Sequence, residues 1–253
     1  MKIAVSGKGG VGKTTISAYF AKKFAREGYQ VYAVDADPDL SLGTVLGIEN
    51  NDILNLKPIV DMRDVIAAKS SGGGAFYTLN PDVDDVLDEY AIDLGNIKFF
   101  KMGAVKQGGS ACYCRENTFL NSLMNSLLLK KKDVVVLDMG AGIEHLTRGT
   151  SKGVDSIVVV TEPTLVSVQT ANVVSNLARE LEIKNVKFIG NKIRRPEEKE
   201  FLLKHLPSED LLGFVSYNDK MLDAALGIES TEGTAGFEKE MDLIYQNLAK
   251  DFN

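Results

Sequence analysis

The residues with the clearest chemical potential lie near the start of the chain. The pattern G-x-x-x-x-G-K-[ST] is matched by Gly7-Lys8-Gly9-Gly10-Val11-Gly12-Lys13-Thr14-Thr15. The glycines let the backbone curl so that successive N–H groups point at a triphosphate. Lys13 can then reach the β- and γ-phosphates, and the Thr14 hydroxyl can bind Mg²⁺. A glycine-rich turn without a ligand is the disfavoured alternative, because the motif lies between a predicted strand and a predicted helix. We therefore expect a nucleotide-binding loop.

Carboxylates follow two further predicted strands. Asp35-Ala36-Asp37-Pro38-Asp39 follows the apolar run at 31–34, and Asp138-Met139-Gly140-Ala141-Gly142 follows the run at 134–137. In open α/β sheets, ligands bind outside the carboxyl ends of the strands. Asp138 is therefore interpreted as a Walker-B-like acid that holds Mg²⁺ through water. For the first acidic run, a solvated turn remains the alternative, since Asp and Pro favour turns.

The elements that must position these residues alternate along the chain. Helical spacing of apolar residues predicts helices, and short apolar runs predict buried strands. The alternation indicates an α/β fold, a doubly wound and mainly parallel sheet with helices on both faces, in one P-loop domain spanning 1–253. The predicted strands are 1–6, 31–35, 76–79, 97–102, 134–138, 157–161, 186–190 and 211–215, and the predicted helices are 15–27, 60–69, 116–129, 167–181, 196–206, 220–225 and 237–252.

Composition narrows the possible partners and compartment. The net charge of −6 argues against a broad nucleic-acid or membrane footprint. No apolar stretch approaches the roughly 18 residues of a membrane-spanning helix, and the chain begins directly with the phosphate loop rather than a signal peptide. Two cysteines do not make a disulfide framework. We expect a cytoplasmic protein without nucleic-acid or membrane partners.

Lys8 makes the loop more specific. With Lys8 in place, the motif resembles the deviant Walker loop of the MinD/nitrogenase-iron-protein class of dimeric ATPases, and the two acidic runs match that class in order. The resemblance implies a nucleotide-dependent homodimer in which Lys8 reaches the partner's nucleotide. It also implies that Asp37 activates water, that Asp35 and Asp138 lie near Mg²⁺, and that Asn191, followed by Lys192, binds the ATP or ADP at its adenine. The alternative for Lys8 is a solvated loop cation.

Two stretches narrow the match within this class. The run Cys112-Tyr113-Cys114-Arg115-Glu116-Asn117 and residues 138–150 resemble the nickel-inserting ATPases of the CooC type, which mature carbon monoxide dehydrogenase. The resemblance implies an ATPase that carries nickel to carbon monoxide dehydrogenase or to acetyl-CoA synthase. The rivals are a positioning ATPase without metal, which needs a basic membrane or DNA surface, and an iron–sulfur carrier of the same class.

The cysteine pair supplies too few ligands for a closed site in one chain. On an extended segment Cys112 and Cys114 point the same way, and they offer two thiolates. Two such pairs facing each other in a dimer supply four thiolates, which suit tetrahedral Zn²⁺ or planar Ni²⁺. Two buried structural cysteines or a redox pair remain the alternatives. The predicted C-terminal apolar stripe is expected to dock on the core rather than on a membrane, because residues 237–253 are net acidic.

Overall fold

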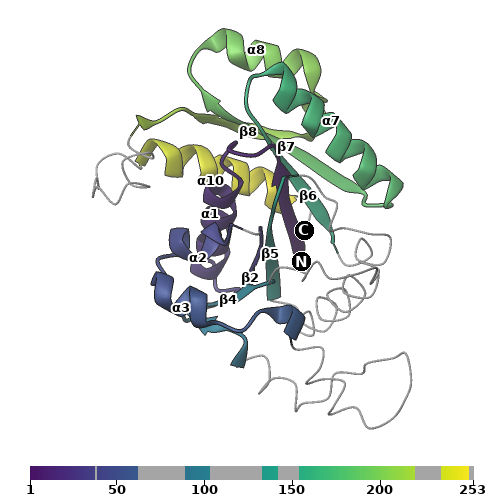
Figure 1. Ribbon diagram of the computed structural model, residues 1–253. Helices are drawn as coiled ribbons and strands as arrows, with labels where there is room; N and C mark the ends of the chain where they lie inside the picture. Colours follow the sequence, from purple (N-terminus) through teal and green to yellow (C-terminus); the bar gives the residue numbers. More distant parts are fainter. Residues whose placement is uncertain (38, 62–88, 103–132, 142–153, 220–234, 251–253) are drawn as a thin grey trace.

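The computed structural model describes residues 1–37, 39–61, 89–102, 133–141, 154–219 and 235–250 (Figure 1). Within these ranges eight strands form one sheet in the order β3-β4-β2-β5-β1-β6-β7-β8. Every neighbouring pair is parallel except β3 and β4. The strands are β1 (Lys2–Gly7), β2 (Gln30–Ala36), β3 (Ile92–Asp93), β4 (Ile97–Lys101), β5 (Asp133–Met139), β6 (Ser156–Thr161), β7 (Asn185–Ile193) and β8 (Leu211–Ser216).

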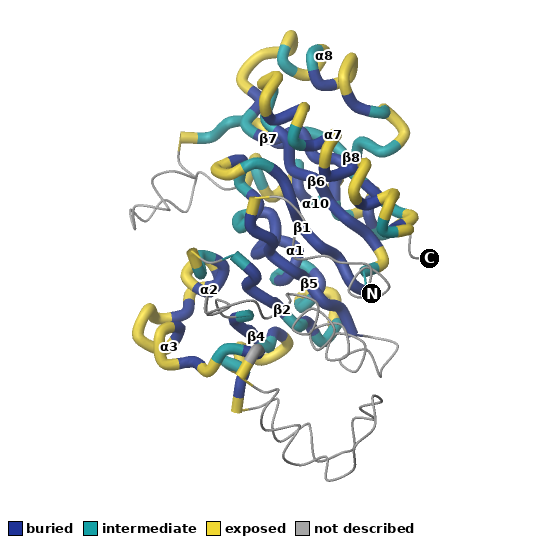
Figure 2. The backbone as a smooth tube through the Cα atoms, turned by 45° about the vertical axis from the view of Figure 1, so that its right-hand side comes forward, coloured by how far each residue is buried: buried dark blue, intermediate teal, exposed yellow. Residues whose placement is uncertain are grey.

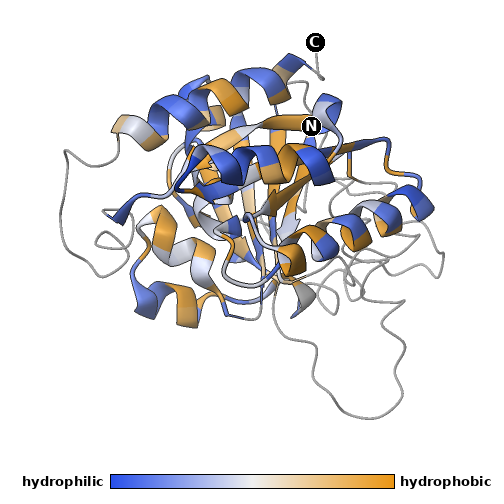
Figure 3. Cartoon of the chain, turned by 90° about the horizontal axis from the view of Figure 1, so that it is seen from above, coloured by the Kyte–Doolittle hydropathy of each residue, from blue (hydrophilic) through white to orange (hydrophobic). Residues whose placement is uncertain are grey.

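Helices cover both faces of this sheet. One face packs against α7 and α8, and the other packs against α1, α2, α3 and α10. The central strands are buried along their length (Figure 2), and apolar residues gather between the sheet and the helices (Figure 3). The α-helices are α1 (Lys13–Arg26), α2 (Ser41–Leu46), α3 (Asn50–Asn55), α7 (Leu165–Glu180), α8 (Pro196–His205) and α10 (Ala235–Ala249), and two 3₁₀ turns are η1 (Ile59–Asp61) and η4 (Ser208–Asp210).

The predicted fold class is confirmed, and most predicted elements appear with small shifts at their ends. Four short elements were not predicted, namely α2, α3, the 3₁₀ turn η4 and the antiparallel strand β3. Strand β7 is longer than predicted, because it continues beside β8 through register shifts. Asn191 and Lys192 consequently lie within the strand rather than after it. The predicted elements at 76–79, 116–129 and 220–225, and most of 60–69, lie outside the described residues.

The C-terminal helix α10 docks on the core, as expected from its apolar stripe. Met241, Ile244 and Leu248 are buried in the cluster that also holds residues of α1 and β8. Tyr19 of α1 donates a hydrogen bond to Asp242 over 2.8 Å, and its ring packs edge-to-face on Phe237. Among the described residues, no helix is long and apolar enough to cross a membrane.

The sheet topology places the predicted site residues at one edge. Strand β1 lies between β5 and β6, and it pairs in parallel with both. Asp35 of β2 and Asp138 of β5 are direct register partners near the carboxyl ends of their strands. Because α1 follows β1 at the same edge, the loop that joins them lies beside both acids. This is the edge at which open α/β sheets bind ligands.

Candidate nucleotide-binding site

The loop between β1 and α1 needs glycine where other backbone approaches it. Gly7 has a φ of 143°, and a Cβ on it would lie 2.3 Å from the backbone oxygen of Val160. Gly12 has a φ of 99°, and a Cβ there would lie 2.5 Å from Nδ2 of Asn191. Asn191 also donates from this amide to the Val11 carbonyl over 2.7 Å. Strands β6 and β7 thus fix the loop from one side.

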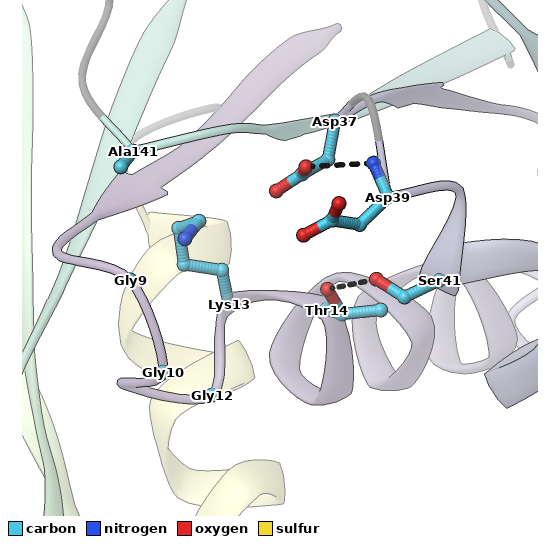
Figure 4. Close-up of a pocket in the computed structure, with 9 residues that line it drawn as sticks. All are labelled: Gly9, Gly10, Gly12, Lys13, Thr14, Asp37, Asp39, Ser41 and Ala141. Carbon is cyan, nitrogen blue, oxygen red and sulfur yellow. Dashed lines mark hydrogen bonds between the residues drawn. The ribbon is translucent and has the colours of Figure 1, made fainter.

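A cavity of about 420 Å³ opens in front of this loop (Figure 4). Figure 4 shows the carboxylates of Asp37 and Asp39 on the side opposite the glycines, with Lys13 between them and Thr14 beside Ser41. The cavity combines a cation, a hydroxyl and backbone amides on one wall with carboxylates on the other, which suits a phosphate chain and a divalent cation. Its lining residues are Gly9, Gly10, Gly12, Lys13, Thr14, Asp37, Asp39, Ser41 and Ala141.

The two loop lysines have different surroundings. Lys13 is buried, and its ammonium donates to the carbonyl oxygen of Lys8 over 3.3 Å. The Lys8 side chain is 39% exposed, and its ammonium lies 3.5 Å from Glu162 at the end of β6. Glu162 also lies 4.0 Å from the ammonium of Lys192, which in turn donates to the Gly10 carbonyl over 2.5 Å. Lys13 is therefore directed into the loop, whereas Lys8 lies on its exposed rim.

Asp138 lies beneath the loop, and its carboxylate has the features of a metal ligand. Burial raises its pKa to about 6, although the neighbouring Thr14 and Ser17 hydroxyls act in the opposite direction. One carboxylate oxygen accepts from the Ser17 hydroxyl over 2.9 Å, while the other is buried and has no partner among the described residues. An orphaned carboxylate oxygen near the Thr14 hydroxyl fits Mg²⁺ and its waters. The residues present therefore suit the metal that the motif implies.

Asp35 is also a buried acid, but its carboxylate is already engaged. Burial raises its pKa to about 7 against two opposing backbone hydrogen bonds. One oxygen accepts from the N–H of Asp37 over 3.2 Å, and the other accepts from the N–H of Leu42 over 2.8 Å. Asp35 lines neither cavity described here.

A second cavity of about 340 Å³ lies on the other side of the loop. Tyr217 lines this cavity, and Arg194 stacks over the Tyr217 ring with its guanidinium carbon 4.1 Å from the ring centre. Glu240 of α10 accepts both the N–H and the hydroxyl of Ser216 and so fixes another wall. An apolar and amide-lined space next to the glycines suits a nucleoside. The lining residues are Gly10, Gly12, Thr15, Asn191, Lys192, Val215, Ser216, Tyr217, Asn218 and Phe237.

The structure brings most of the predicted nucleotide residues together. The glycines, Lys13, Thr14 and Asp37 line the first cavity, while Thr15, Asn191 and Lys192 line the second. Val11 is buried beneath the loop. The predicted metal ligands Cys112 and Cys114 lie outside the described residues, and no group of three or more potential metal ligands occurs within the described part of the chain.

Sequence reasoning missed several residues that line these cavities. Ser41 lies 3.1 Å from Thr14, hydroxyl to hydroxyl, yet no motif marks it. Phe237 was interpreted only as a core residue of the last helix, and the stretch 216–218 carries no pattern that points to a ligand.

Comparison with known proteins agrees with this geometry. A family model described as the CobQ/CobB/MinD/ParA nucleotide binding domain matches residues 2–103. The carbon monoxide dehydrogenase accessory protein CooC of Rhodospirillum rubrum is 40% identical over 228 residues, covering 89% of this chain and 86% of that protein. The chain belongs to the family of this CooC protein, and its residues 2–103 match the MinD/ParA nucleotide-binding domain. The predicted resemblance to the MinD class and to its CooC-type members is thereby confirmed.

Further known proteins match along nearly the full chain. An uncharacterized ATP-binding protein of Methanocaldococcus jannaschii is 38% identical over 258 residues, covering 99% of this chain and 98% of that protein. Among solved structures, the MinD cell division protein of Aquifex aeolicus has a TM-score of 0.68 at 20% identity, covering 98% of this chain and 96% of that one. MinD of Pyrococcus horikoshii, complexed with Mg-ADP, also has a TM-score of 0.68 at 18% identity, with coverages of 100% and 97%. These structures share the fold.

Proposed function

We propose that this protein is an ATP-dependent nickel metallochaperone for carbon monoxide dehydrogenase or acetyl-CoA synthase. ATP binding closes a homodimer, Cys112 and Cys114 from each subunit hold the metal, and hydrolysis releases it. The observation that carries the proposal is the 40% identity to a carbon monoxide dehydrogenase accessory protein, found in a chain that also contains the Cys-x-Cys pair.

The first part of the proposal concerns the nucleotide, which occupies the two cavities. The phosphates lie in the first cavity against the loop amides and Lys13, and the nucleoside lies in the second beside Asn191. Thr14 and Asp138 hold Mg²⁺, which neutralises charge on the phosphates. Asp37 orients the water that attacks the γ-phosphate, and ATP and water give ADP and phosphate.

The second part of the proposal, the formation of a dimer, depends on Lys8. Its ammonium lies on the rim of the loop, in contact with one carboxylate of its own subunit. An exposed ion pair of this kind contributes at most about 1 kcal/mol, so exchanging Glu162 for a partner's phosphate costs little. Lys8 is therefore positioned to complete a second subunit's site. Loss of the γ-phosphate removes that contact and loosens the dimer.

The third part of the proposal, the binding of the metal ion, depends on four thiolates. One pair of cysteines cannot close a four-coordinate site, whereas two pairs related by a dimer axis can. Nickel and zinc both accept such a ligand set. Burial of the α10 stripe on the core supports this role over membrane positioning, because those apolar residues are already used within the molecule.

The decisive experiment is an anaerobic titration with Ni²⁺ and Zn²⁺, with molecular mass measured in ADP and in ATP. The unchanged protein is expected to bind about one metal ion per dimer in ATP, as four thiolates per ion require. The double variant Cys112→Ser/Cys114→Ser is expected to lose stoichiometric metal binding. Its ATP affinity, which depends on the phosphate loop, serves as the control and should stay unchanged.

Tight metal binding that survives in the double serine variant would overturn the cysteine site. A brown, iron-containing protein after anaerobic purification would instead assign the cysteines to an iron–sulfur cluster. Failure of the purified protein to activate nickel-free carbon monoxide dehydrogenase or acetyl-CoA synthase, with metal and ATP present, would remove both clients from the proposal.

A further inference from the structure

Asp35 occupies an unusual position for an acid at a nucleotide site. It is fully buried at the end of β2, and both of its oxygens face backbone amides of the segment that follows. We define the acidic turn as Asp37 together with residues 39–42. One Asp35 oxygen accepts from the first residue of this turn, and the other accepts from the last. A single carboxylate therefore holds both ends of the turn.

The acidic turn carries groups that face the phosphate cavity. Asp37 and Asp39 line that cavity, and Ser41 places its hydroxyl 3.1 Å from that of Thr14 (Figure 4). Within the turn, Asp37 accepts from the N–H of Asp39 through its side chain and from that of Leu40 through its carbonyl, both over 3.1 Å. The orientation of Asp37 is thus set by the conformation of the whole turn.

The turn also contains backbone strain that something must hold. Leu40 adopts a φ of 48°, in the left-handed region that side chains with a Cβ rarely enter. Such a conformation costs on the order of 1–3 kcal/mol and persists only where its surroundings impose it. The buried bond from Leu42 to Asp35 closes the chain two residues after Leu40. The hydrogen bond to Asp35, which we call the anchor of the turn, therefore lies next to the strained residue Leu40.

We propose that Asp35 is a positioning residue that holds the acidic turn in the shape that directs Asp37 at the γ-phosphate. Its contribution to ATP hydrolysis is exerted through Asp37 and not through a bond to metal or nucleotide. The kinetic part of this inference rests on the proposed ATPase function, whereas the structural part concerns the nucleotide-free chain alone.

The chemistry of the anchor suggests a conservative test. Asparagine has the size of aspartate but only one acceptor oxygen, and its amide group cannot accept an N–H. Asp35→Asn therefore releases one end of the turn without leaving a cavity. Asp138→Asn is the matched control, because Asp138 is equally buried in the neighbouring strand but accepts a bond from Ser17 instead of from the turn.

The structural test is amide hydrogen exchange in the nucleotide-free protein. In Asp35→Asn, the Asp37 or Leu42 amide should exchange about tenfold faster, as expected for the loss of one buried hydrogen bond. Exchange in α1 should stay unchanged. Asp138→Asn should leave exchange in the turn as it is. Unchanged exchange of both amides in Asp35→Asn, or an equal rise in both variants, would overturn the proposal.

The kinetic test is a double-mutant cycle with Asp37→Asn. A displaced Asp37 is expected to lower kcat by about 100-fold, as small misplacements of reacting groups do. Affinity for ADP should be retained. The variant with both substitutions should be no slower than Asp37→Asn alone, because Asp35 acts through Asp37.

Additive losses in this cycle would overturn the positioning role. If excess Mg²⁺ restored the kcat of Asp35→Asn, this would also overturn the positioning role and would assign Asp35 to the metal. Absence of ATP hydrolysis by the unchanged protein would overturn the proposed function instead, and the exchange measurement would still decide the structural inference.

Discussion

Two buried carboxylates, Asp35 and Asp138, set the charge balance of the nucleotide-free site. They are register partners on β2 and β5, and burial raises the pKa of each well above the ordinary aspartate range. A group whose pKa is higher in the folded chain binds a proton more tightly there than in the unfolded chain. Stability therefore falls as pH rises from the unfolded pKa of about 4 to the folded values. At neutral pH the two buried carboxylates therefore destabilise the folded chain, and binding of a cation would offset this.

The first prediction follows from the orphaned oxygen of Asp138. Asp138→Asn removes a buried charge while keeping an acceptor for Ser17. At pH 8 the nucleotide-free variant should be more stable than the unchanged protein by on the order of 1–3 kcal/mol. The gain should shrink as pH falls towards 4, where the unchanged carboxyl is protonated. Urea unfolding across this pH range measures it, and a gain that does not vary with pH would contradict the stated cause.

At this scale the sequence predicted the residues whose types are constrained by chemistry. Lys13, Thr14 and Asp37 line one cavity because a phosphate loop requires a cation and a hydroxyl at fixed spacing. Ser41 could not be predicted, because its position depends on a left-handed Leu40 and on a buried bond to Asp35. No local pattern encodes either feature.

Among the elements, α10 connects the end of the chain to the nucleotide site. Its inner side packs on α1 and β8, Phe237 lines the second cavity, and Glu240 accepts hydrogen bonds from Ser216. The helix thus contributes to the core and to a cavity wall at once.

The second prediction tests the packing of this helix with two adjacent residues. Ile244 is buried to 1% exposure and Leu243 is 56% exposed. Ile244→Ala should lower the free energy of unfolding by about 2–5 kcal/mol, because it removes buried methyl groups and leaves a cavity. Leu243→Ala should change it by less than about 0.5 kcal/mol. Equal effects in denaturant unfolding would show that α10 does not dock as described.

Long apolar runs made the strands predictable, while short elements escaped prediction. Helix α2 has six residues and follows Leu40 in a left-handed conformation, with no side-chain cap. Strand β3 has two residues and depends on pairing with β4. The extent of β7 depends on its register with β8, and pairing between distant segments is not visible in a local pattern.

For the whole molecule, the proposed assembly of a homodimer depends on the Lys8 side chain at the exposed rim of the loop. The third prediction is that Lys8→Ala binds ATP with nearly unchanged affinity but stays monomeric, because Lys13 and the loop amides remain. Lys184→Ala removes the same charge from an exposed position that lines neither cavity, and serves as the control. Light scattering in ADP and ATP measures the mass. An ATP-dependent dimer of Lys8→Ala would exclude the role across the interface.

The central place of β1 has a consequence for how the chain is made. Lys2 pairs with Val135 and Ile3 pairs with Ser156, so the first strand has both of its neighbours far along the sequence. During synthesis from the N-terminus, β1 has no partner until β5 has emerged and is not enclosed until β6 follows. Pairing over such separations is slow and leaves apolar surface exposed meanwhile. A nascent chain therefore carries the complete phosphate motif long before it can bind a nucleotide.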